Sequence, residues 1–219
     1  MSKTIINGTI NVLDFCVQKK AKLLFISSGA VNGINESNIK INPTYYSPYN
    51  PLDGNYTYHL GKIFAENLCY NYSLKFNLEV KIARCFAFVG PFLPLKKHFA
   101  IGNFINSVLD KKQIIIKSKG ASIRSYLYSA DLVIWLLKTL INGQNLKPYN
   151  IGSSEEISIL DLATLVSKFG DKEVLVEGNK ENPTFYVPNI DETLFDLKIS
   201  NFFDINTSIS KTFQWYESK

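Results

Sequence analysis

KLLFISSG (residues 22–29) is the stretch that decides the fold. Residues 22–26 form a short, continuous apolar run that ends in serines and a glycine, which predicts a strand buried on both faces. Strands of this kind belong to parallel sheets that are covered by helices on both sides. We therefore expect an α/β protein.

Helical and strand patterns alternate along the rest of the chain. Apolar spacing predicts helices at 4–18, 56–74, 99–109, 132–140, 158–168 and 208–216, and strands at 78–86, 113–117, 149–152 and 173–177. Asp131 and Ser158 are expected to cap the starts of two helices, and Gly143 to end the first of them. The polar, proline-containing stretch 34–55 is predicted to be a long functional loop. The alternation indicates a largely parallel sheet.

Composition narrows the class of protein. The chain has 219 residues, 46% of them apolar, and a net charge of +5 that is nearly all lysine and thinly spread. This favours one substantial core and disfavours nucleic acid as a partner. Three distant cysteines and two histidines suggest neither a disulfide framework nor a metal site. No apolar run approaches the ~18 residues of a membrane span, so we expect a protein of the reducing cytoplasm.

The chain has only two arginines, Arg84 and Arg124. A guanidinium can bind phosphate or carboxylate at two points, which lysine does badly. Either arginine could therefore contact a ligand, or it could serve in a structural ion pair.

Tyr58 and Lys62 lie four residues apart in the predicted helix 56–74, so they share one helical face. An ammonium close to a phenol favours its ionised form, which suits proton transfer. A chain of this composition contains about one such pair by chance, so the pair by itself is weak evidence for a catalytic site. The residues around it are what make it a candidate. Ligands of doubly wound sheets bind beyond the carboxyl ends of the strands, where Ser28 is expected. Together the three residues predict acid–base chemistry beside a hydride carrier.

Five segments in order resemble the extended short-chain dehydrogenase/reductase family, which includes NAD-dependent epimerases and dehydratases of nucleotide sugars. They are SSGAVNG (27–33), the Tyr58–Lys62 pair, RCFAFVGP (84–91), RSYLYSAD (124–131) and YNIGS (149–153). The resemblance covers almost the whole chain. It implies a partial doubly wound parallel (Rossmann-like) sheet with a small C-terminal α/β substrate-binding lobe. The expected division is 1–90 for the nucleotide-binding part and 91–219 for the lobe, interleaved with the last Rossmann elements.

The resemblance also implies roles for single residues. Tyr58 would be the general base, Lys62 would lower the pKa of that phenol and bind the nicotinamide ribose with Ser27, and Ser28 would bind the reacting oxygen. Arg124 would bind the nucleotide diphosphate. Phe88 and Asn103 would contact the substrate. Each residue also has a purely structural alternative. Ser28 could be only a turn residue, Tyr58 a phenol buried in the core, and Arg124 the partner of Asp131 in an ion pair.

Departures from the family pattern narrow the expected reaction. Relatives that dehydrate the sugar carry an Asp-Glu pair after the strand-end hydroxyl residue, and decarboxylases carry a glutamate two residues after it. Gly29 and Ala30 stand there in this chain and cannot move a proton. Ala87 replaces an asparagine that contacts the substrate in the family. These departures favour an epimerase or a 4-ketoreductase over a dehydratase or a decarboxylase.

The family's glycine-rich turn, G-x-x-G-x-x-G, is not found in these residues. That turn carries the cofactor pyrophosphate on a helix N-terminus. The resemblance places Met1 inside the nucleotide-binding half, so we expect NAD or NADP to bind this chain poorly on its own. A separately encoded N-terminal half is one expected partner, and a nucleotide-diphosphate sugar and a second copy of the chain are others. The competing hypothesis is an inactive, truncated remnant or a sugar-nucleotide-binding partner.

Overall fold

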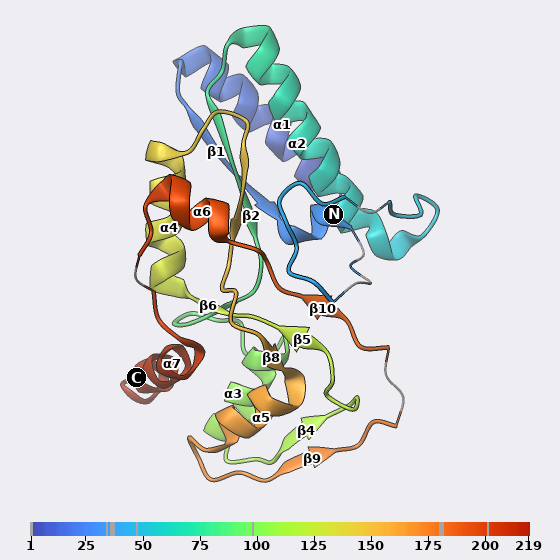
Figure 1. The fold of residues 1–219 in the computed structure, drawn as a ribbon, viewed down its shortest axis with the longest axis vertical. Helices are drawn as coiled ribbons and strands as arrows, with labels where there is room; N and C mark the ends of the chain where they lie inside the picture. The colour runs from blue at the N-terminus through green and yellow to red at the C-terminus, as the bar shows by residue number, and fades with distance from the viewer. Residues whose placement is uncertain are drawn as a thin grey trace.

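The computed structural model describes residues 2–33, 35, 38–46, 48–97, 99–179, 182–200 and 202–219. Its upper part is built on a parallel sheet of three strands in the order β1-β2-β7 (Figure 1). The strands are β1 (Leu23–Ser28), β2 (Val80–Cys85) and β7 (Pro148–Ile151). The predicted parallel α/β sheet is thereby confirmed.

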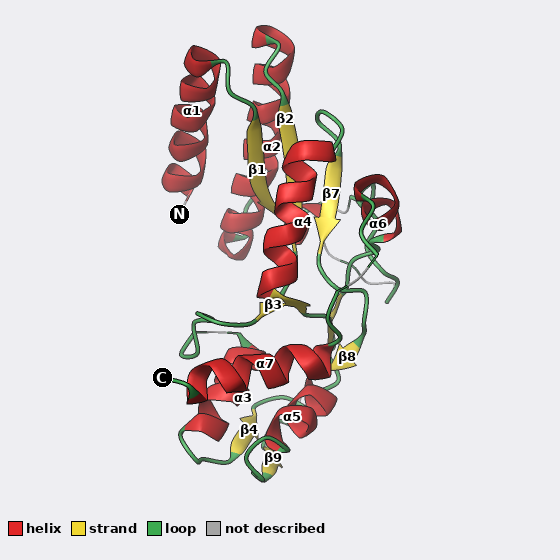
Figure 2. Cartoon of the chain, turned by 90° about the vertical axis from the view of Figure 1, so that its left-hand side faces the viewer, coloured by secondary structure: helices red, strands yellow, loops and turns green. Residues whose placement is uncertain are grey.

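Helices cover both faces of this sheet (Figure 2). One face packs against α1 (Ser2–Lys19) and α2 (Thr57–Phe76), and the other against α4 (Ser129–Asn142) and α6 (Asp191–Leu197). Successive residues of β2 point to opposite sides: Ile82 joins the core cluster of Leu13, whereas Ala83 joins that of Trp135. Both faces of β2 are therefore buried, including its two charged residues, Lys81 and Arg84.

The lower part holds a second core around three helices, α3 (Ala100–Leu109), α5 (Ile159–Ser167) and α7 (Ile205–Glu217). Beside them lies the parallel pair β4 (Ile114–Ile116) and β9 (Val174–Val176). Two small sheets link the parts. One pairs β3 (Phe88–Val89) with β6 (Leu127–Tyr128); the other orders β10 (Phe185–Tyr186), β5 (Ile123–Arg124) and β8 (Ile157–Ser158).

Most of the expected elements are present, with three corrections. Asp131 does not cap its helix: α4 begins at Ser129, and the Asp131 carboxylate instead accepts the backbone N–H of Phe203 at 2.9 Å. The last helix begins at Ile205, because Asp204 accepts the Thr207 N–H as its N-cap. Helix α6 and the two-residue strands were not predicted, since such short segments lack a readable period. Ser158 and Gly143 cap their helices as predicted.

None of the described helices is long and apolar enough to cross a membrane. All three cysteines are free. The described residues contain no group of three histidine, cysteine, aspartate or glutamate side chains arranged to hold a metal ion.

Candidate active site

Ser28 lies at the carboxyl end of β1, as the sequence predicts. Its hydroxyl oxygen accepts the Ala30 N–H at 3.2 Å and so caps a one-turn 3-10 helix, Gly29–Asn32. The side chain is buried. Ser28 is therefore a turn residue at the end of the strand, and its contact with a reacting oxygen stays a prediction.

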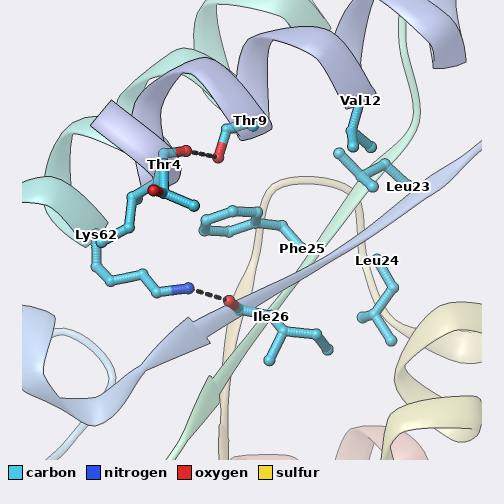
Figure 3. A pocket seen from close by; sticks show the side chains of 10 residues that line it. Thr4, Thr9, Val12, Leu23, Leu24, Phe25, Ile26 and Lys62 are labelled. Carbon is cyan, nitrogen blue, oxygen red and sulfur yellow. Dashed lines mark hydrogen bonds between the residues drawn. The ribbon is translucent and has the colours of Figure 1, made fainter. Parts of the chain in front are cut away.

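Tyr58 and Lys62 occupy the first two turns of α2, which packs against β1. The Lys62 ammonium donates to the carbonyl oxygen of Ile26 at 2.7 Å and lies 5.1 Å from the centre of the Phe25 ring (Figure 3). Burial lowers the pKa of Lys62. This anchor holds the charge of Lys62 on β1, two residues before Ser28.

Tyr186, from β10, lies beside the turn that follows β1. Its hydroxyl oxygen would be 2.6 Å from a Cβ at Gly29, the residue after Ser28. Burial is the main cause that raises the pKa of Tyr186, and the nearby Tyr58 and Tyr49 phenols raise it further. The Tyr186 phenol is thus a neighbour of both the end of β1 and Tyr58.

A cluster of aromatic rings packs beside Tyr58. His59 packs edge-on against Tyr58 at 5.8 Å between ring centres, and Tyr49 packs against His59 at 4.9 Å and Tyr56 at 4.5 Å. The Tyr49 hydroxyl donates to the Ala30 carbonyl at 2.6 Å, and burial raises its pKa to about 12. The protein therefore keeps Tyr49 as a neutral phenol at physiological pH.

Ser27 points away from this group of phenols. Its hydroxyl donates to Glu66 Oε1 at 2.5 Å, and the same carboxylate is bound at two points by Arg84. Arg84 is almost fully buried. The sequence left two roles open for Arg84, a ligand contact or a structural ion pair, and the structure shows the ion pair. The predicted contact of Ser27 with a cofactor stays a prediction.

Side chains from β2, β7 and the 3-10 helix Gly29–Asn32 hold the segment 41–46 against the sheet. Asn150 donates to the Ile41 carbonyl at 2.8 Å, and Arg84 donates to that of Pro43 at 2.6 Å. Asn32 binds two further carbonyls, those of Asn42 and Tyr45, at 3.1 and 2.8 Å. The predicted loop 34–55 is thus fixed here by buried donors, while residues 34, 36, 37 and 47 lie outside the described part.

Gly29 is enclosed by aromatic side chains. A Cβ added at this position would overlap the Phe86 ring and would lie 2.6 Å from the Tyr186 hydroxyl oxygen. The two rings pack together with centres 4.7 Å apart. An acidic side chain at position 29 therefore has no room in this fold.

The other predicted contacts lie in the linking strands and the lower part. Phe88 is half-buried in β3, and Asn103 is exposed on α3. Arg124 donates to the carbonyls of Ile123 and Thr184 at 2.7 and 2.8 Å and to the Thr184 hydroxyl at 2.7 Å. Its alternative ion pair with Asp131 is not observed between these two described residues; the Asp131 carboxylate accepts the Phe203 N–H instead. The structure does not bring Phe88 or Asn103 to Ser28, and their substrate contacts stay predictions.

A groove of about 320 Å³ runs along the outer edge of β1, between that strand and α1 (Figure 3). Its lining is apolar apart from Thr4, Thr9 and Lys62. In the described part of the chain, β1 pairs with β2 on its other side.

The sequence matches a known family over most of its length. The NAD dependent epimerase/dehydratase family matches residues 1–152. The chain belongs to this family. Curated relatives include UDP-glucuronic acid decarboxylase 4 of Arabidopsis thaliana, 31% identical over 80% of this chain and 39% of that protein. UDP-glucuronic acid decarboxylase 1 of Xenopus tropicalis is 28% identical over 99% of this chain and 52% of that protein. The chain thus spans about half or less of these two relatives' length.

Solved structures of similar fold come from several enzymes. dTDP-glucose 4,6-dehydratase of Bacillus anthracis in complex with NAD aligns with a TM-score of 0.86 at 20% identity, over 100% of this chain and 69% of that one. UDP-glucose 4-epimerase of Thermotoga maritima, with UDP-glucose, aligns with a TM-score of 0.85 at 19% identity, over 99% and 70%. At these identities the likeness establishes the family's Rossmann-like α/β fold.

Sequence reasoning proposed Ser28, Tyr58 and Lys62 and did not point to Tyr186 or Glu66. Tyr186 lies 158 positions after Ser28, in a two-residue strand with no period to read. Glu66 carries one weak signal, since it lies one turn after Lys62 on the same helix. Only the tertiary packing places Tyr186 beside Gly29 and Glu66 beside Ser27.

Proposed function

We propose that this family member acts in nucleotide-sugar epimerisation or 4-keto reduction, with Ser28, Tyr58 and Lys62 at the reacting carbon. The observation that supports this most is the packing of α2, which carries Tyr58 and Lys62, against β1, which ends at Ser28, with Lys62 bound to the Ile26 carbonyl of that strand. The proposed substrate is a nucleotide-diphosphate sugar, and the proposed cofactor is NAD or NADP, which when bound supplies the hydride acceptor.

Each of the three residues has a distinct task in this proposal. Tyr58 exchanges a proton with the sugar oxygen, because it is the half-buried phenol on the helix that carries Lys62. Lys62, one helical turn after Tyr58 and held on the Ile26 carbonyl, binds the nicotinamide ribose in this proposal. Ser28 binds the reacting oxygen and fixes the orientation of the carbon.

Dehydration and decarboxylation by the family's usual route fit this site poorly. Position 29 cannot hold a carboxylate because Phe86 and Tyr186 fill the space around it. Position 30 is alanine, although several curated relatives are UDP-glucuronic acid decarboxylases. The relatives therefore support the substrate class, and the local residues support a different reaction on it.

Cofactor binding would need more surface than these residues supply. Lys62 in the β1 groove suits a ribose hydroxyl, but its neighbours there are mostly apolar and offer no cradle for a pyrophosphate. Next to the groove, Ile26 is 42% exposed, and α4 presents an apolar stripe made of Val133, Ile134, Leu137 and Ile141. We infer that a nucleotide-binding unit with a parallel strand pairs with β1, whether in the same polypeptide or as a separately encoded half.

A homodimer through α2 is also proposed. The helix exposes four large apolar or aromatic side chains, Ile63, Phe64, Tyr70 and Leu74. Such a surface on an outer helix is typical of association between subunits. Sedimentation velocity of the parent and of Phe64→Glu tests this proposal, since a dimer at this helix should dissociate in the variant.

Turnover tests the proposed reaction. The chain, alone and with an added nucleotide-binding half from a relative, is incubated with a UDP-hexose and NAD(P)(H), followed by NADH absorbance and product chromatography. Isomer formation without net NAD(P)H use indicates an epimerase, and net use indicates a reductase. Tyr58→Phe should lower turnover at least ~100-fold, whereas Tyr216→Phe, which removes a phenol bound to the Leu93 carbonyl in the lower part, should not.

The second candidate is a binding protein without catalysis, and one observation favours it. The Lys62 ammonium already has a backbone acceptor at 2.7 Å, which makes it a structural contact as it stands. Binding of a UDP-hexose with no turnover under any cofactor condition would support this alternative and exclude the enzyme.

A further inference from the structure

The guanidinium nearest to the end of β1 is already engaged. Arg84 is almost fully buried, and each nitrogen of its guanidinium has an acceptor. Two bonds go to the Glu66 carboxylate, at 2.9 and 2.7 Å. The others go to the Pro43 carbonyl at 2.6 Å and the Tyr46 hydroxyl at 3.0 Å. A guanidinium that is neutralised in this way can bind a carboxylate of a ligand only by breaking its own ion pair.

Other basic side chains beside the site have tasks of their own. Lys62 donates to a carbonyl of β1 at 2.7 Å and lines the groove along that strand. Arg124 binds two backbone carbonyls at 2.7 and 2.8 Å, and the family resemblance assigns it to the nucleotide diphosphate. Lys40, next to the segment 41–46, pairs with Glu156 at 3.6 Å. Among the described residues, these side chains offer no spare cation to a charge on the sugar.

The side chains around the turn after β1 are uncharged. Phe86 and Tyr186 enclose Gly29, with ring centres 4.7 Å apart and the phenol oxygen 2.6 Å from the position of an added Cβ. Tyr49 donates its single proton to the Ala30 carbonyl at 2.6 Å, so its oxygen can only accept a further hydrogen bond. A phenol has an ordinary pKa of about 10 and is therefore neutral at physiological pH. The turn is thus lined by neutral rings and hydroxyls.

We propose that the site is selective for an uncharged sugar, a nucleotide-diphosphate hexose whose C6 group is a hydroxymethyl or a methyl and not the carboxylate of a hexuronic acid. The sugar ligand itself is taken from the proposed function, on which this selectivity rests. A carboxylate moved from water into this lining would find no free counter-charge, and the Tyr49 oxygen would offer it only lone pairs. A hydroxymethyl group can donate to such an oxygen and accept from another hydroxyl.

The charge of the whole chain acts in the opposite direction. Its net charge of +5 attracts the more negative of two ligands at long range. A preference for the uncharged sugar therefore has to come from the local lining. UDP-glucuronic acid decarboxylases, which include several curated relatives, act on a sugar that carries this carboxylate. The lining separates this chain from them by the substrate as well as by the reaction.

Calorimetric binding of UDP, UDP-glucose and UDP-glucuronic acid to the full 219-residue chain tests this selectivity. UDP-glucose is expected to bind at least ~10-fold more tightly than UDP-glucuronic acid. Equal affinities, or tighter binding of UDP-glucuronic acid, would overturn the proposal. Binding of both sugar nucleotides no tighter than that of UDP would also overturn it, because the sugar would then not reach the lining.

A variant that adds a cation to the lining sharpens the test. Tyr186→Arg replaces a neutral wall beside Gly29 and is expected to reduce the preference for UDP-glucose at least ~5-fold. Phe195→Arg is the matched control, since it adds the same charge at an 84% exposed position on α6. An unchanged preference in Tyr186→Arg, or an equal change in both variants, would show that the lining does not decide it. Thermal unfolding identifies a variant that has lost its fold, and the preference of the parent then decides.

Turnover separates this selectivity from the proposed function. If UDP-glucose is preferred in binding but no cofactor condition gives turnover, the proposed function fails and the selectivity stands. If UDP-glucuronic acid is turned over faster than UDP-glucose, the site is catalytic as proposed and the selectivity is wrong.

Discussion

The guanidinium of Arg84 and the carboxylate of Glu66 are joined at two points, Nε to Oε1 at 2.9 Å and Nη2 to Oε2 at 2.7 Å. Their side chains are only 2% and 13% exposed. Ser27 adds a third bond to the carboxylate, and Arg84 also donates to the Pro43 carbonyl and the Tyr46 hydroxyl. One ion pair therefore joins β1, β2, α2 and the segment 41–46 directly behind Ser28.

Arg84→Ala is expected to lower the free energy of unfolding by about 3 kcal/mol, because it leaves the buried Glu66 carboxylate without its counter-charge. Urea unfolding measures the loss. The matched control is Lys22→Ala, which removes an exposed ion pair with Glu79 and should cost less than about 1 kcal/mol. Arg84→Met combined with Glu66→Leu should be milder than Arg84→Ala. Equal losses for Arg84→Ala and Lys22→Ala would show that burial does not strengthen this pair.

Two glycines should respond to alanine in opposite ways. Gly29→Ala places a methyl group against the Phe86 ring and the Tyr186 hydroxyl, so we expect a loss of about 1–3 kcal/mol. Gly8→Ala, in the interior of α1 with no atom within 4 Å of the added group, should stabilise by about 0.5–1 kcal/mol. Thermal unfolding measures the stability of both variants against the parent. A Gly29→Ala protein as stable as the parent would contradict the observed packing.

The N-cap of α7 should depend on pH. The Thr207 N–H and hydroxyl bind the Asp204 carboxylate and hold its pKa below the ordinary value of 3.8. A lowered folded pKa means that the cap stabilises fully above 3.8 and is lost as pH falls through the folded value. Asp204→Ala should cost about 1 kcal/mol at pH 7, and the difference from the parent should shrink in acid. A constant difference down to pH 2 would exclude the carboxylate as the cause.

Binding of the cofactor to these residues alone should be very weak. No glycine-rich turn is present among them, and the groove beside Lys62 offers mostly apolar side chains. Calorimetry of the purified chain with NADH should give no dissociation constant tighter than the millimolar range. A micromolar constant would contradict this expectation. Adding a nucleotide-binding half that pairs with β1 should restore affinity.

Sequence patterns were sufficient for the elements with a clear period. The apolar run before Ser28 and the spacing of Tyr58 and Lys62 predicted the strand and helix that carry them, because buried strands and amphipathic helices have to repeat apolar residues. Helix caps were predicted less well. Ser158 caps its helix as expected, whereas Asp131 lies inside its helix and accepts the backbone N–H of Phe203, 72 residues away.

The sequence alone determined the family, the parallel α/β class and the three candidate residues, since these depend on local periodicity and on short motifs. The tertiary structure decided which groups lie beside them: Tyr186 at the turn that follows Ser28, Glu66 with Arg84 behind Ser27, and the Ile26 carbonyl at Lys62. Such contacts join segments up to 158 positions apart. They follow from how strands and helices pack against one another, and no local pattern in the chain records that packing.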